Sequence, residues 1–155
     1  MGTEIERKFL LAGDGWRKLA KGVYYCQGYL STDRARTVRV RIVGDQGFLT
    51  VKGIGHGIER PEFEYPIPRQ DARTMLDRLC IHPLIEKNRY TIRYRGSVWE
   101  VDEFLGENQG LILAEIELAS KDQPFARPEW IGREVSGDPR YFNSSLVRNP
   151  YRSWP

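Results

Sequence analysis

The sequence predicts a mainly β (α+β) protein, built as a closed eight-stranded antiparallel β-barrel with a few flanking helices. Three observations lead to this fold class. Apolar and polar residues alternate with a period of two along most of the chain, as in strands with two different faces. Short turn sequences separate many of these segments, and short connections favour antiparallel pairing. The chain has 155 residues, the size of one domain, so we expect a single domain over residues 1–155.

The alternation occupies eight segments, and we expect a strand at each. They are residues 3–10, 23–32, 36–43, 47–53, 58–66, 84–94, 97–105 and 111–119. Glycine-containing stretches at 44–47, 53–57 and 95–97 have the composition of hairpin loops. Eight antiparallel strands with few helices form either a barrel or a closed sandwich.

Three further segments have helical features. Asp14 is placed to cap a short helix that continues to Ala20. Pro68 leads into a stretch in which apolar side chains recur at helical spacing as far as residue 80. Pro139 can start a third helix over about 139–147.

Composition and charge exclude several classes of protein. About 40% apolar and 29% charged residues are typical of a soluble globular chain. The net charge of +3 comes from 24 basic and 21 acidic side chains, whereas nucleic-acid binders favour a one-sided basic excess, so we expect no nucleic-acid partner. The sequence has neither an apolar signal segment nor a stretch long enough to span a bilayer, so we expect a cytoplasmic protein without membrane association.

The unusual feature of the strands is the charge on one face of most of them. In an ordinary half-buried strand, the polar face carries mixed residues that meet water. Here the alternate positions hold acidic and basic side chains. The basic set consists of Lys8, Arg39, Arg41, Lys52, Lys87 and Arg89. The acidic set consists of Glu4, Glu6, Glu62, Glu64, Asp102, Glu115 and Glu117.

Two interpretations of these charged faces are open. In the first, they point to water and the apolar faces close one core, because exposed charge pairs are common and contribute little to stability. In the second, the apolar faces pack against helices and neighbouring segments, while the charged faces line a central tunnel. Interleaved acids and bases can be satisfied in such a tunnel by pairing, by water and by bound ions.

A tunnel lined by both signs of charge predicts a particular kind of ligand. Carboxylates are hard oxygen ligands suited to Mg²⁺ or Mn²⁺. Arginine binds phosphate oxygens through its planar fork, and lysine binds them as a point charge. A polyphosphate chain that carries metal meets both requirements, so we expect a small polyanionic substrate.

The ordered series of motifs resembles the triphosphate tunnel metalloenzymes, also called the CYTH superfamily. The opening residues 4–8, Glu-Ile-Glu-Arg-Lys, match the Glu-x-Glu-x-Lys signature of that family. The resemblance continues in order through the remaining basic and acidic positions. Residues 27–30 and 138–143 are also similar to the compact bacterial members, so the resemblance covers nearly the whole chain.

The resemblance implies an eight-stranded antiparallel tunnel that binds a triphosphate with divalent metal ions, Mg²⁺ or Mn²⁺. The chain is most similar to the compact inorganic triphosphatases, which implies hydrolysis of inorganic tripolyphosphate to pyrophosphate and phosphate. A class IV-type adenylyl cyclase, a thiamine triphosphatase and a non-catalytic polyphosphate-binding module stay open as alternatives. A homodimer is left open as well.

By the same resemblance, the basic set would hold the phosphate groups. Glu4 and Glu6, with one or both of Glu115 and Glu117, would hold one metal ion. The other acidic residues, which are Glu62, Glu64 and Asp102, would lie near a second ion.

The expected catalytic pair is Tyr29 with Lys52, again by resemblance. A cation near a phenol lowers its pKa and makes it a better base. The other interpretation of Tyr29 is a packed aromatic residue on a strand.

Overall fold

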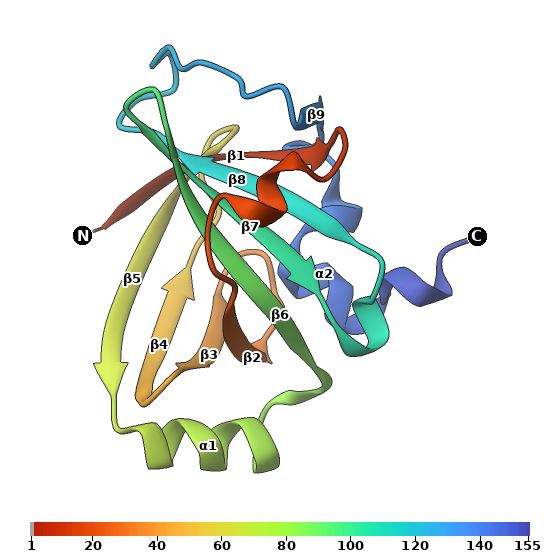
Figure 1. Cartoon of the computed structure of the whole chain (residues 1–155). Helices are drawn as coiled ribbons and strands as arrows, with labels where there is room; N and C mark the ends of the chain where they lie inside the picture. The colour runs from red at the N-terminus through yellow and green to blue at the C-terminus, as the bar shows by residue number, and fades with distance from the viewer. Residues whose placement is uncertain (1) are drawn as a thin grey trace.

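The computed structural model describes residues 2–155 and consists of one antiparallel sheet that closes on itself (Figure 1). Its strands are β1 (Thr3–Leu11), β2 (Val23–Ser31), β3 (Thr37–Val43), β4 (Gln46–Lys52), β5 (Glu59–Ile67), β6 (Ile81–Tyr94), β7 (Ser97–Phe104), β8 (Ile112–Glu117) and β9 (Ile131–Glu134). Neighbours follow the order β5-β4-β3-β2-β6-β7-β8-β1-β9. The start of β1 also pairs with the start of β5, which closes β1 to β8 into the predicted barrel.

All eight predicted strands are present, with bounds within three residues of those expected. The ninth strand, β9, was not predicted. It pairs with the later part of β1, beyond the stretch that meets β5. Its sequence, Ile-Gly-Arg-Glu, is too short to show a clear period of two. Gly132 lies so close to the neighbouring backbone that an added Cβ would stand 3.1 Å from the Leu10 carbonyl oxygen.

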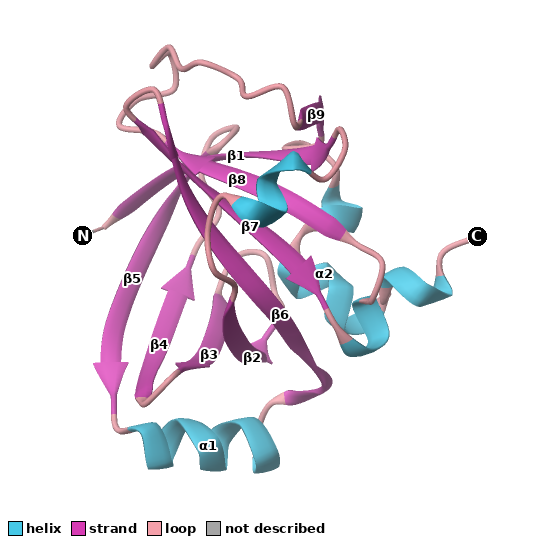
Figure 2. Ribbon diagram, in the orientation of Figure 1, coloured by secondary structure: helices cyan, strands magenta, loops and turns pink. Residues whose placement is uncertain are grey.

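The helices lie around the strands, and α1 runs across the lower end of the sheet in the view of Figure 2. They are α1 (Arg69–Arg78) and α2 (Asn143–Arg148), with the 3₁₀ turns η1 (Gly15–Lys18), η2 (Gly106–Asn108), η3 (Pro139–Tyr141) and η4 (Tyr151–Ser153). Among residues 2–155 no helix is long and apolar enough to cross a membrane.

Two helix predictions need correction. The segment after Asp14 forms only the turn η1, and the Asp14 side chain makes no capping hydrogen bond. The helix expected over 139–147 is divided into η3 and α2, because Phe142 between them has an extended backbone (φ −68°, ψ 134°). The α1 prediction is confirmed, although that helix ends at Arg78.

Much of the apolar core lies outside the barrel wall. Phe9 on β1 packs in a cluster with Trp99 on β7, Trp16 on η1 and Trp130 just before β9. The rings of Phe9 and Trp99 meet edge to face with centroids 5.5 Å apart, which is a favourable arrangement for aromatic pairs. The outer segments of the chain therefore cover the apolar faces of the strands.

Helix α1 covers a second part of the outer wall. Val40 on β3 packs there against Ala72 and Leu76 of the helix. Gly47 on β4 allows the close approach, since an added Cβ would lie 2.9 Å from the Ala72 Cβ. The apolar residues that predicted this helix thus form the face that packs on the sheet.

A third cluster closes part of the barrel from the inside. Ile85, Phe104 and Leu113 share the inward faces of β6, β7 and β8 with charged residues two positions away. They pack with Tyr29 and with Leu146 of α2. We call these five residues the apolar floor, and the charged lumen ends at this floor.

The outer core generates a stability prediction. Phe9 is fully buried, and Phe9→Ala is expected to lower the free energy of unfolding by about 3–5 kcal/mol because it leaves a cavity among aromatic rings. The matched control is Phe63→Ala on β5, where the side chain is 46% exposed, and it should cost less than about 1 kcal/mol. Denaturant unfolding of both variants measures the difference. Equal costs would contradict a core placed outside the barrel.

Candidate functional site

The inward faces of the strands enclose a cavity of about 300 Å³. It is lined by Tyr29, by the whole basic set and by the whole acidic set except Asp102. These residues come from seven of the eight barrel strands, so positions far apart in the sequence meet in one space. The charged faces therefore line a lumen, and the interpretation in which they point outward to water is wrong.

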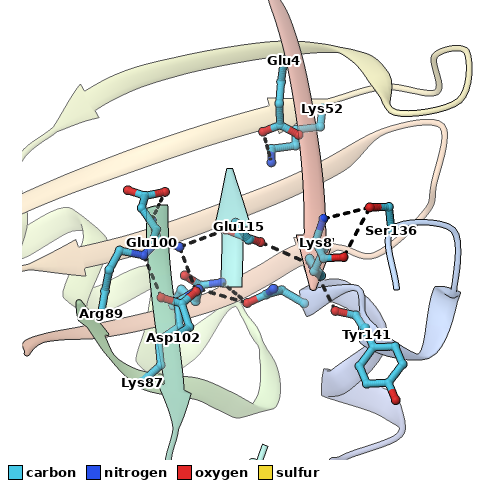
Figure 3. Close-up of polar contacts among 12 residues, drawn as sticks. Glu4, Lys8, Lys52, Lys87, Arg89, Glu100, Asp102, Glu115, Ser136 and Tyr141 are labelled. Atoms are coloured by element: carbon cyan, nitrogen blue, oxygen red, sulfur yellow. Dashed lines mark hydrogen bonds and ion pairs between the residues drawn. The ribbon is translucent and has the colours of Figure 1, made fainter. Parts of the chain in front are cut away.

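Asp102 on β7 organises the cations nearest the apolar floor. Its two carboxylate oxygens accept hydrogen bonds of 2.8 Å from Arg89 Nε and Nη2, and Lys87 Nζ lies 2.8 Å from Oδ2 (Figure 3). The side chains of Asp102 and Lys87 are each only 1% exposed. Burial alone would raise the pKa of Asp102, but Arg89 and Lys87 outweigh it and hold that pKa well below its ordinary value.

The metal-ligand role expected for Asp102 stays a prediction, and the contacts that its carboxylate makes are to cationic side chains. Both of its oxygens are engaged by Arg89 and Lys87, and its side chain is absent from the cavity lining. In this structure Asp102 instead fixes the direction in which two phosphate-binding candidates point. The spacing of residues in the sequence could not reveal this, because a carboxylate that binds metal and one that binds arginine have the same pattern.

Glu115 on β8 lies between cations from two other strands. Its oxygens are 3.4 Å from Lys8 Nζ and 3.3 Å from Arg89 Nη2 (Figure 3). Burial would raise the pKa of Glu115, but the positive charges, Lys8 first among them, lower it to about 2. Glu115 therefore stays ionised and links β1 to β6.

Lys8 also fastens the C-terminal segment to the barrel. Its ammonium donates a 3.1 Å hydrogen bond to the Tyr141 carbonyl oxygen, and its backbone N–H donates one of 2.8 Å to Ser136 Oγ (Figure 3). Asn143, farther along this segment, accepts 3.2 Å hydrogen bonds at Oδ1 from Gln27 Nε2 and Lys87 Nζ. The segment after β9 thus forms part of the site rather than a free tail.

Lys52 on β4 pairs with carboxylates of β1 and β5. Its Nζ donates a 2.7 Å hydrogen bond to Glu4 Oε1 and lies 3.6 Å from Glu62 Oε2. Burial would raise the pKa of Glu4, yet Lys52 outweighs it and the pKa is lowered. Tyr29 lines the same cavity and is 4% exposed, but within residues 2–155 no hydrogen bond joins it to Lys52. The structure thus places the expected catalytic pair in one cavity, without a hydrogen bond between the two groups.

The lumen has an acidic wall, formed by Glu4 and Glu6 of β1 and Glu117 of β8. Glu6 and Glu117 are cross-strand neighbours, and neither forms an ion pair within the described residues. Burial, together with the negative charges of Glu115 and Glu4, raises the pKa of Glu6 to about 8. Burial and the Glu4 carboxylate also raise the pKa of Glu117. Within the described residues the chain therefore supplies no cationic partner for Glu6 or Glu117, whereas Glu4 pairs with Lys52.

The lumen also has a basic wall, formed by Arg39 and Arg41 of β3. Arg41 Nε donates a 3.0 Å hydrogen bond to Gln27 Oε1 but meets no carboxylate in the described chain. Burial and the nearby Arg39 and Arg89 charges lower the pKa of Arg41 to about 9. Arg39 lies 3.8 Å from Glu64, and its Nε is buried without a hydrogen-bond partner among residues 2–155. This wall therefore has one guanidinium group without an ion pair, that of Arg41, and one with an unused donor, that of Arg39.

The acidic wall fits a divalent cation by its chemistry. Its donors are carboxylate oxygens, the ligands that hard divalent ions prefer, and their mutual repulsion would be relieved by a positive ion. The ligand geometry is not assembled in advance, since no three Asp, Glu, His or Cys side chains among residues 2–155 converge on a metal position. The carboxylate of Glu4 turns to Lys52 instead.

Sequence reasoning missed part of the lining. The missed residues on strands are Thr37, Thr50, Arg60 and Glu100. Each stands two positions from a predicted site residue, so the period of two could have identified it. The missed residues in the loops and the C-terminal segment include Arg34, Ser136, Phe142, Asn143 and Ser144. No periodic pattern marks those positions.

The raised pKa of Glu6 gives a pH-dependent prediction. The folded state holds this proton from pH 4.5, the ordinary value, to about pH 8, so the stability from Glu6 is complete below 4.5 and is lost as pH rises through 8. In chelator, Glu6→Gln should match the wild type at pH 4.5 and melt higher at pH 8.5. A gain of about 1–2 kcal/mol corresponds to roughly 3–6 °C in a chain of this size.

The control for this measurement is Glu107→Gln, which changes an exposed carboxylate in η2 away from the lumen. Thermal unfolding of wild type and both variants at the two pH values gives the comparison. The same difference in melting temperature at pH 4.5 and pH 8.5 would contradict the raised pKa of Glu6.

Known proteins resemble this chain over nearly its full length. An inorganic triphosphatase of Acetivibrio thermocellus is 56% identical over 154 residues, with 99% of each chain covered. An inorganic triphosphatase of Nitrosomonas europaea is 38% identical over 149 residues, covering 94% of this chain and 97% of the relative. The crystal structure of an inorganic triphosphatase has a TM-score of 0.66 and 36% identity, covering 92% of this chain and 96% of the other.

A Pyrococcus furiosus protein at 22% identity, with a TM-score of 0.58, covers 77% of this chain and 80% of its own length, and it supports the fold alone. The CYTH domain matches residues 2–151, which include every strand described above. The closed barrel, the charged lumen and the match over nearly the full chain agree. The chain therefore belongs to the CYTH domain family.

Proposed function

We propose that this protein is a metal-dependent inorganic triphosphatase that cleaves tripolyphosphate to pyrophosphate and phosphate. The observation that carries the proposal is the lumen itself, in which Arg41 of the basic wall and Glu6 and Glu117 of the acidic wall have no ion-pair partner among residues 2–155. A triphosphate satisfies the first wall, and a divalent cation carried with it satisfies the second. The two relatives named inorganic triphosphatases, at 56% and 38% identity, support the same substrate.

The basic set would bind the phosphate oxygens. Arg41 would contribute a guanidinium group without a carboxylate partner in the described chain, and Arg39 one whose carboxylate partner, Glu64, lies 3.8 Å away. Lys87 and Arg89 are already held by Asp102, so they would meet the substrate with little rearrangement. Phosphoryl transfer depends mainly on positioning and on neutralising charge, and rigid buried cations supply both.

Glu4, Glu6 and Glu117, together with Glu115, would hold Mg²⁺ or Mn²⁺, and Glu62 and Glu64 would lie near a second ion. Such ions neutralise phosphate charge and make water more acidic. Asp102 is left out of this ligand set because its contacts to Arg89 and Lys87, at 2.8 Å, are shorter than the contacts of 3.3–3.4 Å that Glu115 makes to Arg89 and Lys8.

In the proposed reaction, water attacks the terminal phosphorus and the bond to the bridging oxygen breaks. Pyrophosphate leaves with the electrons of that bond, and the proton lost by water passes to a base. Tyr29 is the proposed base on the strength of its place in the lining, with Lys52 as a phosphate-binding neighbour. The proposed location is the cytoplasm, which the buried free thiols Cys26 and Cys80 favour, because reducing compartments maintain such thiols.

Assays of phosphate release from tripolyphosphate, ATP and thiamine triphosphate, run side by side, test this proposal directly. We expect phosphate release from tripolyphosphate to exceed release from ATP and thiamine triphosphate, to require Mg²⁺ or Mn²⁺, and to stop in chelator. Full activity in chelator would contradict the metal requirement. A cyclic nucleotide product from ATP would indicate a cyclase, and binding of tripolyphosphate without release would indicate a non-catalytic module.

Two variants connect that activity to the lumen. Arg41→Ala is expected to lower kcat/KM for tripolyphosphate by about 100-fold, because it removes a charged phosphate contact from a buried site. Arg93→Ala removes an equal charge from an exposed position of β6 outside the cavity lining and should leave the rate unchanged. Equal rates for the two variants would exclude the lumen as the site of hydrolysis.

A further inference from the structure

Two arginines that belong to neither wall also border the cavity. Arg34 lies on the connection between β2 and β3, and Arg60 lies at the start of β5. Gly57 and Ile58 of the preceding loop also line the cavity. These two arginines therefore mark the place where connecting loops meet the charged lumen, and we call them the rim pair.

Arg60 has a donor that the chain leaves unused. It stands opposite Glu4 in the pairing of β5 with β1, but the Glu4 carboxylate accepts from Lys52. The Nε atom of Arg60 is buried and has no hydrogen-bond partner within residues 2–155. A buried donor without a partner carries the full cost of its lost hydration, so an acceptor at this position would stabilise it.

Arg34 is held beside the cavity by an aromatic ring rather than by an acid. Its guanidinium carbon lies 4.2 Å from the centroid of the Phe142 ring, and Phe142 is itself part of the lining. The acid next to it in sequence, Asp33, pairs instead with Arg36 at 2.6 Å. Within residues 2–155 Arg34 thus forms no ion pair, although a carboxylate is its direct neighbour.

The two members of the rim pair also act on each other. Burial, together with the positive charge of Arg60, lowers the pKa of Arg34. Two like charges near one another, with no carboxylate assigned to either, raise the free energy of the empty site. An anion that contacts both removes the repulsion and satisfies the buried Nε donor together.

We propose that Arg34 and Arg60 bind the outermost phosphate group of the substrate chain, beyond the phosphates held by Arg39 and Arg41. This inference rests on the proposed function and adds a specificity-determining pair to it. The terminal group of a linear polyphosphate carries more negative charge than an internal one, so it gains most from two additional cations. A chain of three phosphates extends farther than a chain of two, and the rim pair therefore distinguishes tripolyphosphate from pyrophosphate.

The test compares two ligands on four proteins. Wild type, Arg34→Ala, Arg60→Ala and Arg36→Ala are titrated calorimetrically in chelator with tripolyphosphate and with pyrophosphate. Each rim variant should bind tripolyphosphate about tenfold more weakly, the effect of one charged contact, while its affinity for pyrophosphate changes less than about twofold. Arg36→Ala is the matched control, since it removes the same charge from the same loop outside the cavity lining.

Two results would overturn the inference. One is wild-type affinity for tripolyphosphate in both rim variants. The other is an equal loss of affinity for tripolyphosphate and pyrophosphate. A general attraction of the rim pair for any anion would give that result. If an alanine variant does not fold, as judged by its thermal unfolding, Arg34→Lys and Arg60→Lys replace it. They keep the charge but lose the planar fork, and the same difference between ligands is expected at smaller size.

The proposed function and the rim pair fail in distinguishable ways. A wild type that neither binds nor hydrolyses tripolyphosphate would overturn both. A wild type that hydrolyses it, with rim variants that behave like Arg36→Ala, would overturn the rim pair alone.

Discussion

Charges that point into this barrel have largely left bulk water, and the rest of the structure depends on how they are compensated. A buried ion without a partner is expensive, so a charged lumen is stable only where acids and bases alternate around it. Asp102, between Lys87 and Arg89, meets this condition fully and does so at the deepest point, next to the apolar floor. Because the inward faces are charged, the apolar faces must pack elsewhere. The turn η1, helix α1 and the segment before β9 provide that packing on the outside.

Some charged side chains of the lumen have partners of opposite charge and others do not. We place the function at those without partners. The pairs around Asp102, Glu115 and Lys52 satisfy one another within the chain. Arg41 and Glu6 do not, and their pKa values are displaced toward the neutral form, one downward and one upward. A structure that served stability alone would have little reason to enclose both. A polyanion with a cation supplies the missing partners of both walls, which is why an anionic substrate bound with metal accounts for the site better than either component alone.

Much of the fold could be predicted because the period of two reports directly on strands and on which face each side chain occupies. The same rule brought every predicted charge except Asp102 into the cavity lining. It could not show that Asp102 is engaged by Arg89, since pairing depends on which strands become neighbours. It also could not detect β9, which is four residues long, or Arg34, which lies on a loop. Nor does the sequence pattern mark the division of the third helix at Phe142, where the backbone is extended.

The measurement that tests the central claim most directly is a crystal structure with tripolyphosphate and Mn²⁺, in which anomalous scattering locates the metal. The two-wall account predicts phosphate groups within hydrogen-bonding distance of Arg39 and Arg41. It also predicts a manganese peak at the carboxylates of Glu6 and Glu117. Phosphate bound outside the lumen, or manganese bound away from the acidic wall, would contradict the account.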